Sequence, residues 1–304
     1  MNKIYSTTLS YKANEEDVGK TAENILKHKL NISAGLIKEL KMIGKIKINE
    51  KSCRSIDVVN FNDIVSADIE EVEVSQIPEY NYKLDILFED AHILVVNKPA
   101  GISMHPCLGD YDKTLAGAII HHWRKNGEEH NFHAVNRLDK NTSGICIIAK
   151  NRYSHGILSK QTKNLIEKEY TAIVRGKLTK PGIINAPIKR ADTSIIKRIV
   201  DSGGKEAITV YTPIEYNEIY TTVKIKLLTG RTHQIRVHFS HIGHPLYGDW
   251  LYGTGDNEGH LIERHALVSD KIKFFHPVSG ELFEFNVELP NDMKLLISNL
   301  KSCF

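Results

Sequence analysis

The feature that most constrains the fold is a change in the spacing of apolar residues near residue 80. Before it, Ala22, Ile25 and Leu26 recur at helical spacing. After it, apolar residues come in short runs such as 93–96 and 145–149, typical of buried strands. The chain has 304 residues, about twice the ~150 of one domain. We therefore expect two domains, 1–78 and 79–304, and interpret 78–82 as the linker.

The first part predicts two short helices and a hairpin. Ser33 is a plausible N-cap for the second helix, and Gly44 closes it. Residues 45–49 alternate between lysine and isoleucine, which indicates a strand that ends in a turn at Asn49 and Glu50. We expect a small α/β domain, and we expect its removal at residue 78 to leave the core of the second domain covered.

Charge is strongly segregated in the same region, although the whole chain carries only +3. Residues 18–54 hold nine Lys and Arg against three Glu, and residues 57–90 then hold ten acidic residues against one lysine. A basic unit followed by an acidic strand favours contact with RNA. The alternative is a solvated surface rich in lysine. The candidate RNA-binding residues are Lys20, Lys27, Lys38, Lys41, Lys45 and Lys47.

The second part predicts an α+β domain with a mixed or antiparallel sheet. Helices are expected at 115–124 and at 156–163, the latter capped by Ser154. Residues 220–228 alternate cleanly between apolar and polar side chains, as a half-buried strand does. The other expected strands are 93–96, 145–149, 170–174, 208–212 and 283–287.

Several classes of protein are excluded by what the sequence lacks. No stretch approaches the ~20 apolar residues of a membrane span, and residues 1–17 have no apolar core like that of a signal peptide. The four cysteines are far apart, without a Cys-x-x-Cys pair, which disfavours disulfide frameworks and zinc sites. We therefore expect a cytoplasmic protein without a membrane partner.

Two polar segments carry the chemistry. The first is Asn-Arg-Leu-Asp at 136–139, which leads into the strand at 145. Asp139 lies in a polar turn between apolar segments, where a carboxylate can be a nucleophile, a general acid or base, or a turn cap. The residues alone leave these three possibilities open.

The second segment is Thr-Gly-Arg-Thr-His-Gln-Ile-Arg-Val-His at 229–238. It predicts a helix with Ile235 and Phe239 on one face, and with Gln234 and His238 on the opposite side. Arg236 lies at the edge of the apolar stripe, where a partly buried guanidinium needs an anionic partner. His238, His241 and His244 spread around the helix and its end, with no acidic residue in the segment. We therefore expect no metal site there.

Together these segments resemble the RluA/RluD-type pseudouridine synthases. The resemblance rests on Asn-Lys-Pro-Ala-Gly at 97–101, Asn-Arg-Leu-Asp at 136–139, Lys-Glu-Tyr at 168–170 and the 230–238 segment, in the family's order and spacing. Gly-His-Pro at 243–245 and His-Pro-Val-Ser-Gly at 276–280 match too, so the resemblance covers about residues 84–292. The basic N-terminal part is similar to the "S-four" RNA-binding domain that many members carry.

The resemblance implies isomerisation of uridine to pseudouridine in RNA, without cofactor or metal. Asp139 is then the nucleophile, Arg236 its ion-pair partner, and Tyr170 a residue that stacks on the base and is a candidate general base. A neighbouring cation favours the ionised carboxylate. The residues expected to contact substrate are Asn136, Arg137, Arg231, His233, Gln234 and His238. Asn136 stands where the family often has a histidine. This difference leaves open how the chain contacts RNA near the target uridine once that base is turned out of the stack.

Two other functions are compatible with the same residues. A non-catalytic RNA-binding protein could keep the fold, and a base-removing glycosidase could let water capture the sugar. Among relatives with this N-terminal domain, large-subunit ribosomal RNA is the commonest substrate, and transfer RNA is the alternative. We expect a monomer.

Overall fold

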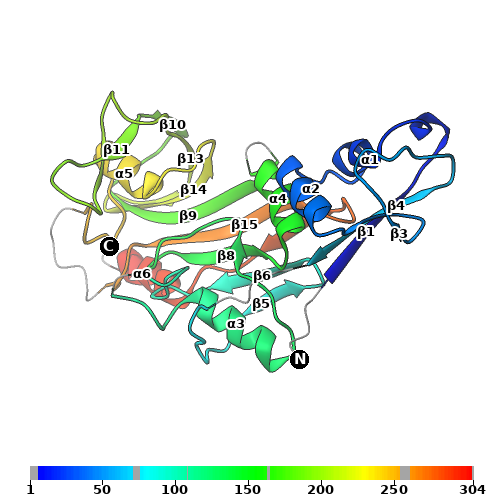
Figure 1. The fold of residues 1–304 in the computed structure, drawn as a ribbon. Helices are drawn as coiled ribbons and strands as arrows, with labels where there is room; N and C mark the ends of the chain where they lie inside the picture. Colours follow the sequence, from blue (N-terminus) through cyan, green and yellow to red (C-terminus); the bar gives the residue numbers. More distant parts are fainter. Residues whose placement is uncertain (1–5, 71–75, 108, 163–164, 254–260, 303–304) are drawn as a thin grey trace.

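The computed structural model describes residues 6–70, 76–107, 109–162, 165–253 and 261–302 (Figure 1). Most of the described strands belong to two sheets. Residues up to 70 contribute a four-stranded sheet in the order β1-β4-β2-β3, and later residues contribute a ten-stranded sheet. We call the residues 6–70 the N-terminal unit. The elements therefore form two bodies of different size that lie side by side in Figure 1.

The N-terminal unit confirms the two helices and the hairpin. Ser33 caps the second helix by accepting a hydrogen bond from the backbone N–H of Leu36 at 3.3 Å. Asn49 and Glu50 both have positive φ, of 49° and 67°, as the tight hairpin turn requires. The sequence did not predict the first strand. The elements are β1 (Ser6–Lys12), α1 (Ala22–His28), α2 (Ala34–Met42), β2 (Ile46–Ile48), β3 (Lys51–Ser52) and β4 (Ile64–Glu70).

The large sheet is mixed, as expected for an α+β fold. Its main path runs β10-β13-β14-β9-β15-β8-β6-β5, with β16 on β15 and β7 on β8. Every pair is antiparallel except β8 with β15. The strands of this sheet are β5 (Ile86–Glu89), β6 (Ile93–Lys98), β7 (His133–Ala134), β8 (Ser143–Ala149), β9 (Glu167–Arg175), β10 (Gly182–Asn185), β13 (Ile208–Tyr216), β14 (Tyr220–Leu227), β15 (Leu267–Phe275) and β16 (Leu282–Asn286).

Helices cover both faces of this sheet. Alternate strand residues point to opposite faces, so Leu94 and Val96 join one core while Ile93 and Val95 join another. The first core includes α3 (Leu115–Lys125) and α5 (Gln234–His241). On the opposite face lie α4 (Arg152–Gln161) and α6 (Asn291–Ser302). A separate hairpin, β11 (Ile188–Arg190) with β12 (Arg198–Val200), lies beside α5.

The expected cap of α4 is wrong by three residues. Asn151 is the N-cap, because its side-chain oxygen accepts the N–H of Ser154 at 2.8 Å. Ser154 is buried within the helix instead of preceding it. Both residues are polar and short, and asparagine caps helices as well as serine does, so composition alone does not distinguish the two positions. The expected end of the helix, Lys163, lies outside the described residues, as does Cys303.

The segment expected to be a linker packs tightly against the large sheet's α3. Tyr80 donates its backbone N–H to the carbonyl of Gly117 at 3.1 Å. A Cβ on Gly117 would lie 2.4 Å from the carbonyl oxygen of Pro78, so only glycine allows this approach. Glu79 pairs with Arg124 at 2.8 Å. Residues 78–82 are therefore part of the body that they were expected to tether.

The N-terminal unit also shares its core with α4. Tyr153 and Ile157 of that helix pack into the cluster formed by α1, α2 and β4. Arg152 donates to both carboxylate oxygens of Glu39 on α2, at 2.8 and 2.9 Å. Removing the first 78 residues would uncover Tyr153 and Ile157, so the expectation of a clean cut at residue 78 is wrong.

Candidate active site

The candidate site lies where the only parallel pair among the described strands of the large sheet begins. Since β8 and β15 run in the same direction, their first residues meet at one edge, with Val268 opposite Ser143. Gly144 has φ +119°, and a Cβ there would lie 2.2 Å from the carbonyl oxygen of Ser269. The close approach explains the glycine at this position. The loop that enters β8 carries Asp139 to this edge.

Buried side chains fix the backbone on both sides of Asp139. Asn136 binds the backbone of β8 with its amide, donating to the carbonyl of Ile145 at 2.9 Å and accepting from the N–H of Ile147 at 2.8 Å. Lys98 is fully buried and donates to the carbonyls of Pro99, Ile102 and Lys140, at 2.8 to 3.0 Å.

The three carbonyls use all three donors of the Lys98 ammonium. Burial lowers the pKa of Lys98 to about 8, while the charge of Asp139 opposes that shift. These contacts give Lys98 a structural role in the turn. Because Lys140 follows Asp139, one buried cation joins the turn at 99–102 to the residue beside the candidate nucleophile.

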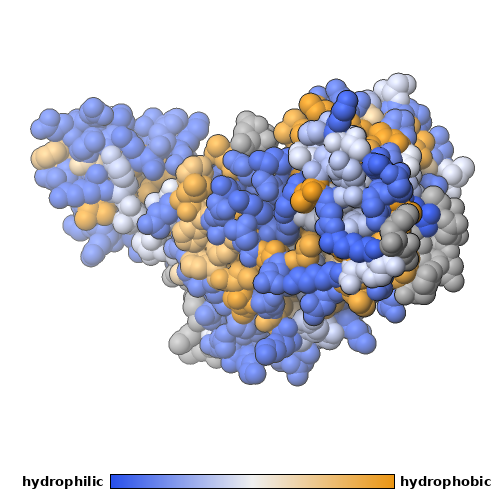
Figure 2. Space-filling model, turned by 180° about the vertical axis from the view of Figure 1, so that it is seen from behind, coloured by the Kyte–Doolittle hydropathy of each residue, from blue (hydrophilic) through white to orange (hydrophobic). Residues whose placement is uncertain are grey.

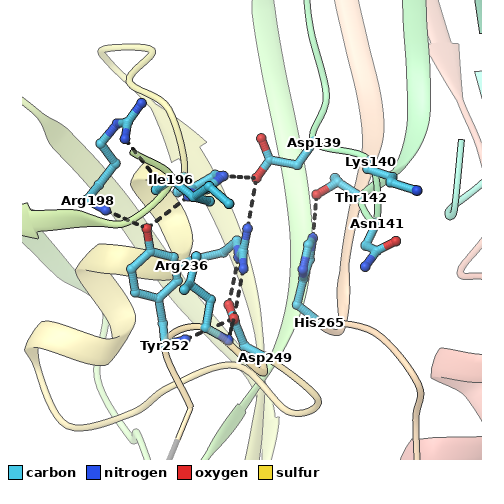
Figure 3. A network of polar contacts seen from close by, with 12 residues as sticks. Asp139, Lys140, Asn141, Thr142, Ile196, Arg198, Arg236, Asp249, Tyr252 and His265 are labelled. Carbon is cyan, nitrogen blue, oxygen red and sulfur yellow. Dashed lines mark hydrogen bonds and ion pairs between the residues drawn. The ribbon is translucent and has the colours of Figure 1, made fainter. Parts of the chain in front are cut away.

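Arg236 connects Asp139 to a second, buried carboxylate. Its Nε and Nη2 donate to Asp249 at 2.7 and 2.8 Å, and its Nη1 donates to Asp139 at 3.3 Å (Figure 3). The side chain of Arg236 is 4% exposed and that of Asp249 is 0%, whereas Asp139 is 29% exposed. Burial would raise the pKa of Asp249, but the hydrogen bonds from Arg236 hold it below its usual range. The arginine is thus locked in place by one carboxylate and presents its remaining nitrogen to the other.

Asp249 is one of the site residues that were not predicted from the sequence. It follows Gly248, whose φ is +68° and whose Cβ would lie 2.2 Å from the carbonyl oxygen of Arg264. This close approach brings the segment after α5 against the start of β15. The available signal was a lone acidic residue in the otherwise apolar segment 245–252, since a charge in such a setting is buried only when it is paired.

His233 and Tyr252 complete the surroundings of Asp139. The Nε2 atom of His233 lies 3.7 Å from Asp139 Oδ2, and its Nδ1 is 2.8 Å from the Tyr252 hydroxyl. That hydroxyl accepts the backbone N–H of Arg198 at 2.9 Å, so its own hydrogen is available to Nδ1. His233 has φ +58°, an uncommon conformation for a residue other than glycine. Burial lowers its pKa, with Asp139 opposing and Arg236 adding to the shift.

Tyr170 lies in β9 on the same face of the sheet as α5 and belongs to its core cluster. Burial raises its pKa well above the usual range, and the negative charge of Asp139 raises it further. The hydroxyl is therefore protonated at neutral pH. A protonated phenol can donate a hydrogen bond to a reacting group, but it must lose its proton before it can act as a base.

A buried pair lies next to Asp139, whose backbone carbonyl accepts the N–H of Thr142 at 3.0 Å. Thr142 Oγ1 lies 2.7 Å from His265 Nε2, joining the residue before β8 to the segment before β15. His265 is 2% exposed. Burial lowers its pKa to about 3, and the cation of Arg236 acts in the same direction. His265 is therefore neutral at pH 7, and its hydrogen bond with Thr142 holds the two segments together.

The structure separates the residues expected to contact substrate into two groups. Arg137 is exposed beside Asp139, and Arg231 and His233 are partly exposed. Asn136, Gln234 and His238 are buried and bound to protein partners. Gln234 binds the backbone around Ile208, and His238 binds Thr209 and the carbonyl of Ala186. The structure gives these three structural roles instead of the expected contacts with substrate.

The candidate RNA-binding lysines divide in a similar way. Lys20 pairs with the buried Asp17 at 2.9 Å, and Lys47 pairs with Asp68 at 2.7 Å. Lys27, Lys38 and Lys41 are exposed on α1 and α2, and Lys45 is partly buried. Folding therefore neutralises part of the basic segment by bringing Asp17 and Asp68 against it.

Metal-binding clusters and membrane spans are both missing from the described residues. In the part of the chain that the structure describes, no three His, Cys, Asp or Glu side chains are grouped so that they could hold a metal ion. Within the same residues, no helix has the length and apolar character needed to span a bilayer.

Comparisons with known proteins show what this chain is similar to. Residues 92–241 fit the profile of a family described as RNA pseudouridylate synthase. The uncharacterized RNA pseudouridine synthase YhcT of Bacillus subtilis is 42% identical, over 93% of this chain and 94% of the relative. The ribosomal large subunit pseudouridine synthase D of Salmonella typhimurium is 32% identical, over 97% of this chain and 95% of the relative. The solved structure of human RNA pseudouridylate synthase domain containing 1 aligns with a TM-score of 0.58 and 25% identity, over 74% of this chain and 97% of that one.

The fold, the site and these similarities place the chain in the RluA/RluD-type family of RNA pseudouridine synthases. It is an enzyme that isomerises uridine in RNA, as the sequence resemblance implied. The non-catalytic alternative is thereby set aside.

Proposed function

We propose that this enzyme converts uridine to pseudouridine in large-subunit ribosomal RNA, with Asp139 as the nucleophile. The observation that carries the assignment of Asp139 is its contact with Arg236. A partly exposed carboxylate receives a hydrogen bond from an arginine that a buried second carboxylate holds in position. The ribosomal target is supported by relatives named ribosomal large subunit pseudouridine synthase D, at 32 to 39% identity.

The reaction needs one carboxylate as nucleophile, the loss of a proton from carbon 5 and the gain of a proton at nitrogen 1. In the route through the sugar, Asp139 attacks the anomeric carbon as the bond to ring nitrogen breaks, parallel to a retaining glycosidase. Uracil leaves as a stable anion, turns, and carbon 5 attacks the anomeric carbon while the bond to Asp139 breaks. The hydrogen on carbon 5 is then lost to solvent and nitrogen 1 gains a proton, so the product is an isomer. The alternative first step is attack on the pyrimidine ring.

The surrounding residues have distinct proposed roles. Arg236 stabilises the carboxylate of Asp139 when it is not bonded to the sugar. His233 also lies close to Asp139 Oδ2, the oxygen that Arg236 contacts. Tyr170 supplies an aromatic face for the base and a hydroxyl near Asp139. Arg137 is exposed next to the nucleophile, where it can fill the space left by an extruded uridine or hold a phosphate.

The N-terminal unit is proposed to supply affinity that does not depend on sequence. Its exposed lysines on α1 and α2 can bind phosphates. The shared core with α4 gives this unit a defined position relative to the large sheet. RNA that binds both bodies is therefore oriented with respect to Asp139.

The decisive experiment is a map of pseudouridine in total RNA from cells with and without this protein. A carbodiimide adduct that stops reverse transcription detects the isomer, which has unchanged mass. We expect stops in large-subunit ribosomal RNA that disappear with the gene. Stops that disappear only from transfer RNA would replace the proposed target. Release of free uracil from purified RNA would instead indicate a base-removing glycosidase.

A further inference from the structure

An exposed apolar turn lies at the edge of the candidate active site. It joins β11 to β12, and its two isoleucines, Ile195 and Ile196, are 80% and 51% exposed. The face of the molecule in Figure 2 shows apolar residues in patches between polar ones, and single exposed apolar residues are ordinary on protein surfaces. Two adjacent isoleucines at the tip of a hairpin beside a catalytic carboxylate form a more specific feature.

The turn is held in a defined conformation. The Oγ atom of Ser194 accepts the N–H groups of Ile196 and Lys197, at 3.3 and 3.1 Å. The Nη1 atom of Arg198 lies 2.9 to 3.3 Å from the carbonyl oxygens of Ile195, Ile196 and Lys197 and donates to them. The apolar side chains are thus presented by a turn that is already ordered, which limits the entropy cost of binding.

The hairpin is also linked to the proposed nucleophile through Tyr252 and His233. The N–H of Arg198 binds the Tyr252 hydroxyl, which binds His233, whose Nε2 faces Asp139. Figure 3 draws the contact between Arg198 and Tyr252 and the contacts of Arg236 with Asp139 and Asp249. A continuous chain of polar groups therefore joins the hairpin to the carboxylate.

The charge of the hairpin fits a nucleic acid. Residues 188–205 contain five cations and two carboxylates. Both carboxylates, Asp192 and Asp201, lie near Lys189, at 3.8 and 3.0 Å. Arg190, Lys197 and Lys205 are exposed. The apolar tip can contact stacked bases of a nucleic acid, while the exposed cations on either side bind its phosphates.

We propose that Ile195 and Ile196 form a wedge that enters the base stack of structured RNA next to the target uridine and keeps that uridine extruded. Arg198 and Tyr252 hold the wedge in register with Asp139. Apolar wedges of this kind unstack base steps in other nucleic-acid complexes. The inference rests on the proposed position of the uridine at Asp139.

The test uses the full-length protein and total RNA, labelled with tritium at carbon 5 of uridine, from cells that lack the gene. Isomerisation releases this tritium into water. Single-turnover rates are compared for wild type, Ile195→Ser, the double variant Ile195→Ser/Ile196→Ser and Leu295→Ser. Leu295 is 59% exposed on α6 and controls for removal of a surface apolar side chain. Thermal unfolding of each variant shows whether it is folded.

We expect the double variant to be at least about tenfold slower on RNA at low temperature, while Leu295→Ser matches wild type. The defect should shrink as the temperature approaches the melting of the RNA, because the uridine then leaves its stack unaided. Wild-type rates in folded variants would overturn the wedge. A defect that stays constant with temperature would also overturn it, because that result indicates a change in the geometry around Asp139. Asp139→Asn is run in parallel, and its activity tests the proposed nucleophile independently.

Discussion

Arg236 forms its two shortest charged contacts with Asp249, at 2.7 and 2.8 Å, and both side chains are buried. The nucleophile candidate receives only the remaining nitrogen, at 3.3 Å. An arginine that belonged to Asp139 alone would have to follow it when the carboxylate forms a covalent bond. Anchored by Asp249, it can keep its position while the charge on Asp139 changes, which is the condition for electrostatic preorganisation.

Replacing Asp139 with asparagine should abolish isomerisation and leave the fold intact. The amide is nearly isosteric, but it is a far weaker nucleophile. Tritium release from carbon 5 of uridine measures the reaction, and the matched control is Asp110→Asn, which removes a nearby carboxylate paired with Lys140. Residual turnover within about tenfold of wild type, about 1.4 kcal/mol of barrier, would exclude Asp139 as nucleophile.

Asp249→Asn should lower both activity and stability, because it leaves Arg236 buried without its main partner. Breaking such a pair costs about 3–5 kcal/mol, to be measured by denaturant unfolding. The double variant Arg236→Gln/Asp249→Asn should regain stability but not activity, since it removes the unpaired charge. The control, Glu288→Gln, breaks an exposed pair with Lys294 and should change stability little. A fully active Asp249→Asn enzyme would contradict the anchoring role.

Tyr170→Phe keeps the aromatic face and removes the hydroxyl. Proton-transfer groups typically contribute about 10²–10⁴-fold to rate, so turnover should fall by at least about 100-fold while RNA affinity persists. Single-turnover tritium release and a binding titration separate the two effects. Tyr211→Phe, at a partly buried tyrosine packed against the same core cluster, is the control. Near-normal turnover of Tyr170→Phe would reduce Tyr170 to stacking and packing.

His265 should make the protein less stable as the pH falls below about 6.5. Burial lowers its folded-state pKa to about 3, so between these values the unfolded chain binds the proton and the folded chain does not. The free energy of unfolding then decreases by up to about 1.4 kcal/mol per pH unit from this group. His265→Gln should show a shallower decrease than wild type. His28→Gln, at an exposed site on α1, is the control for replacing a histidine by glutamine; parallel curves for His265→Gln and wild type would refute the assignment.

The exposed lysines of the N-terminal unit should supply most of the RNA affinity that this unit contributes. A triple variant, Lys27→Gln/Lys38→Gln/Lys41→Gln, should weaken binding and flatten its log–log salt dependence by roughly 0.7–0.9 for each phosphate that is no longer bound. Titrations at several salt concentrations provide the measurement. Lys177→Gln/Lys294→Gln/Lys301→Gln removes the same charge from sites paired with glutamates. Equal slopes for both triple variants would show that the lysines form only a solvated surface.

Local patterns in the sequence predicted most of the elements. Ser33 and the Asn49–Glu50 turn act on neighbouring residues of the chain, and a buried Arg236 requires an anion wherever it lies. Contacts between distant segments could not be predicted in this way. Asp249 reaches Arg236 because Gly248 brings a loop against Arg264, and nothing in that loop's spacing indicates it.

The same distinction explains the errors in charge and polarity. Lys20 and Lys47 look like free cations in the sequence, but strand pairing and turns place Asp17 and Asp68 against them. His238 lies on the polar side of its helix, yet Thr209 and the segment around Ala186 cover that side. A helix wheel describes one element and cannot show what packs on it.

The shared core between α4 and the N-terminal unit has a consequence for protein engineering. Tyr153 and Ile157 belong to the cluster of a unit whose own residues end some 80 positions earlier in the chain. A chimera that exchanged only the first 76 residues between relatives would join mismatched halves of one core. The smallest exchangeable module therefore comprises the N-terminal unit together with the α4 surface that completes it, and recombination sites should be chosen to carry both.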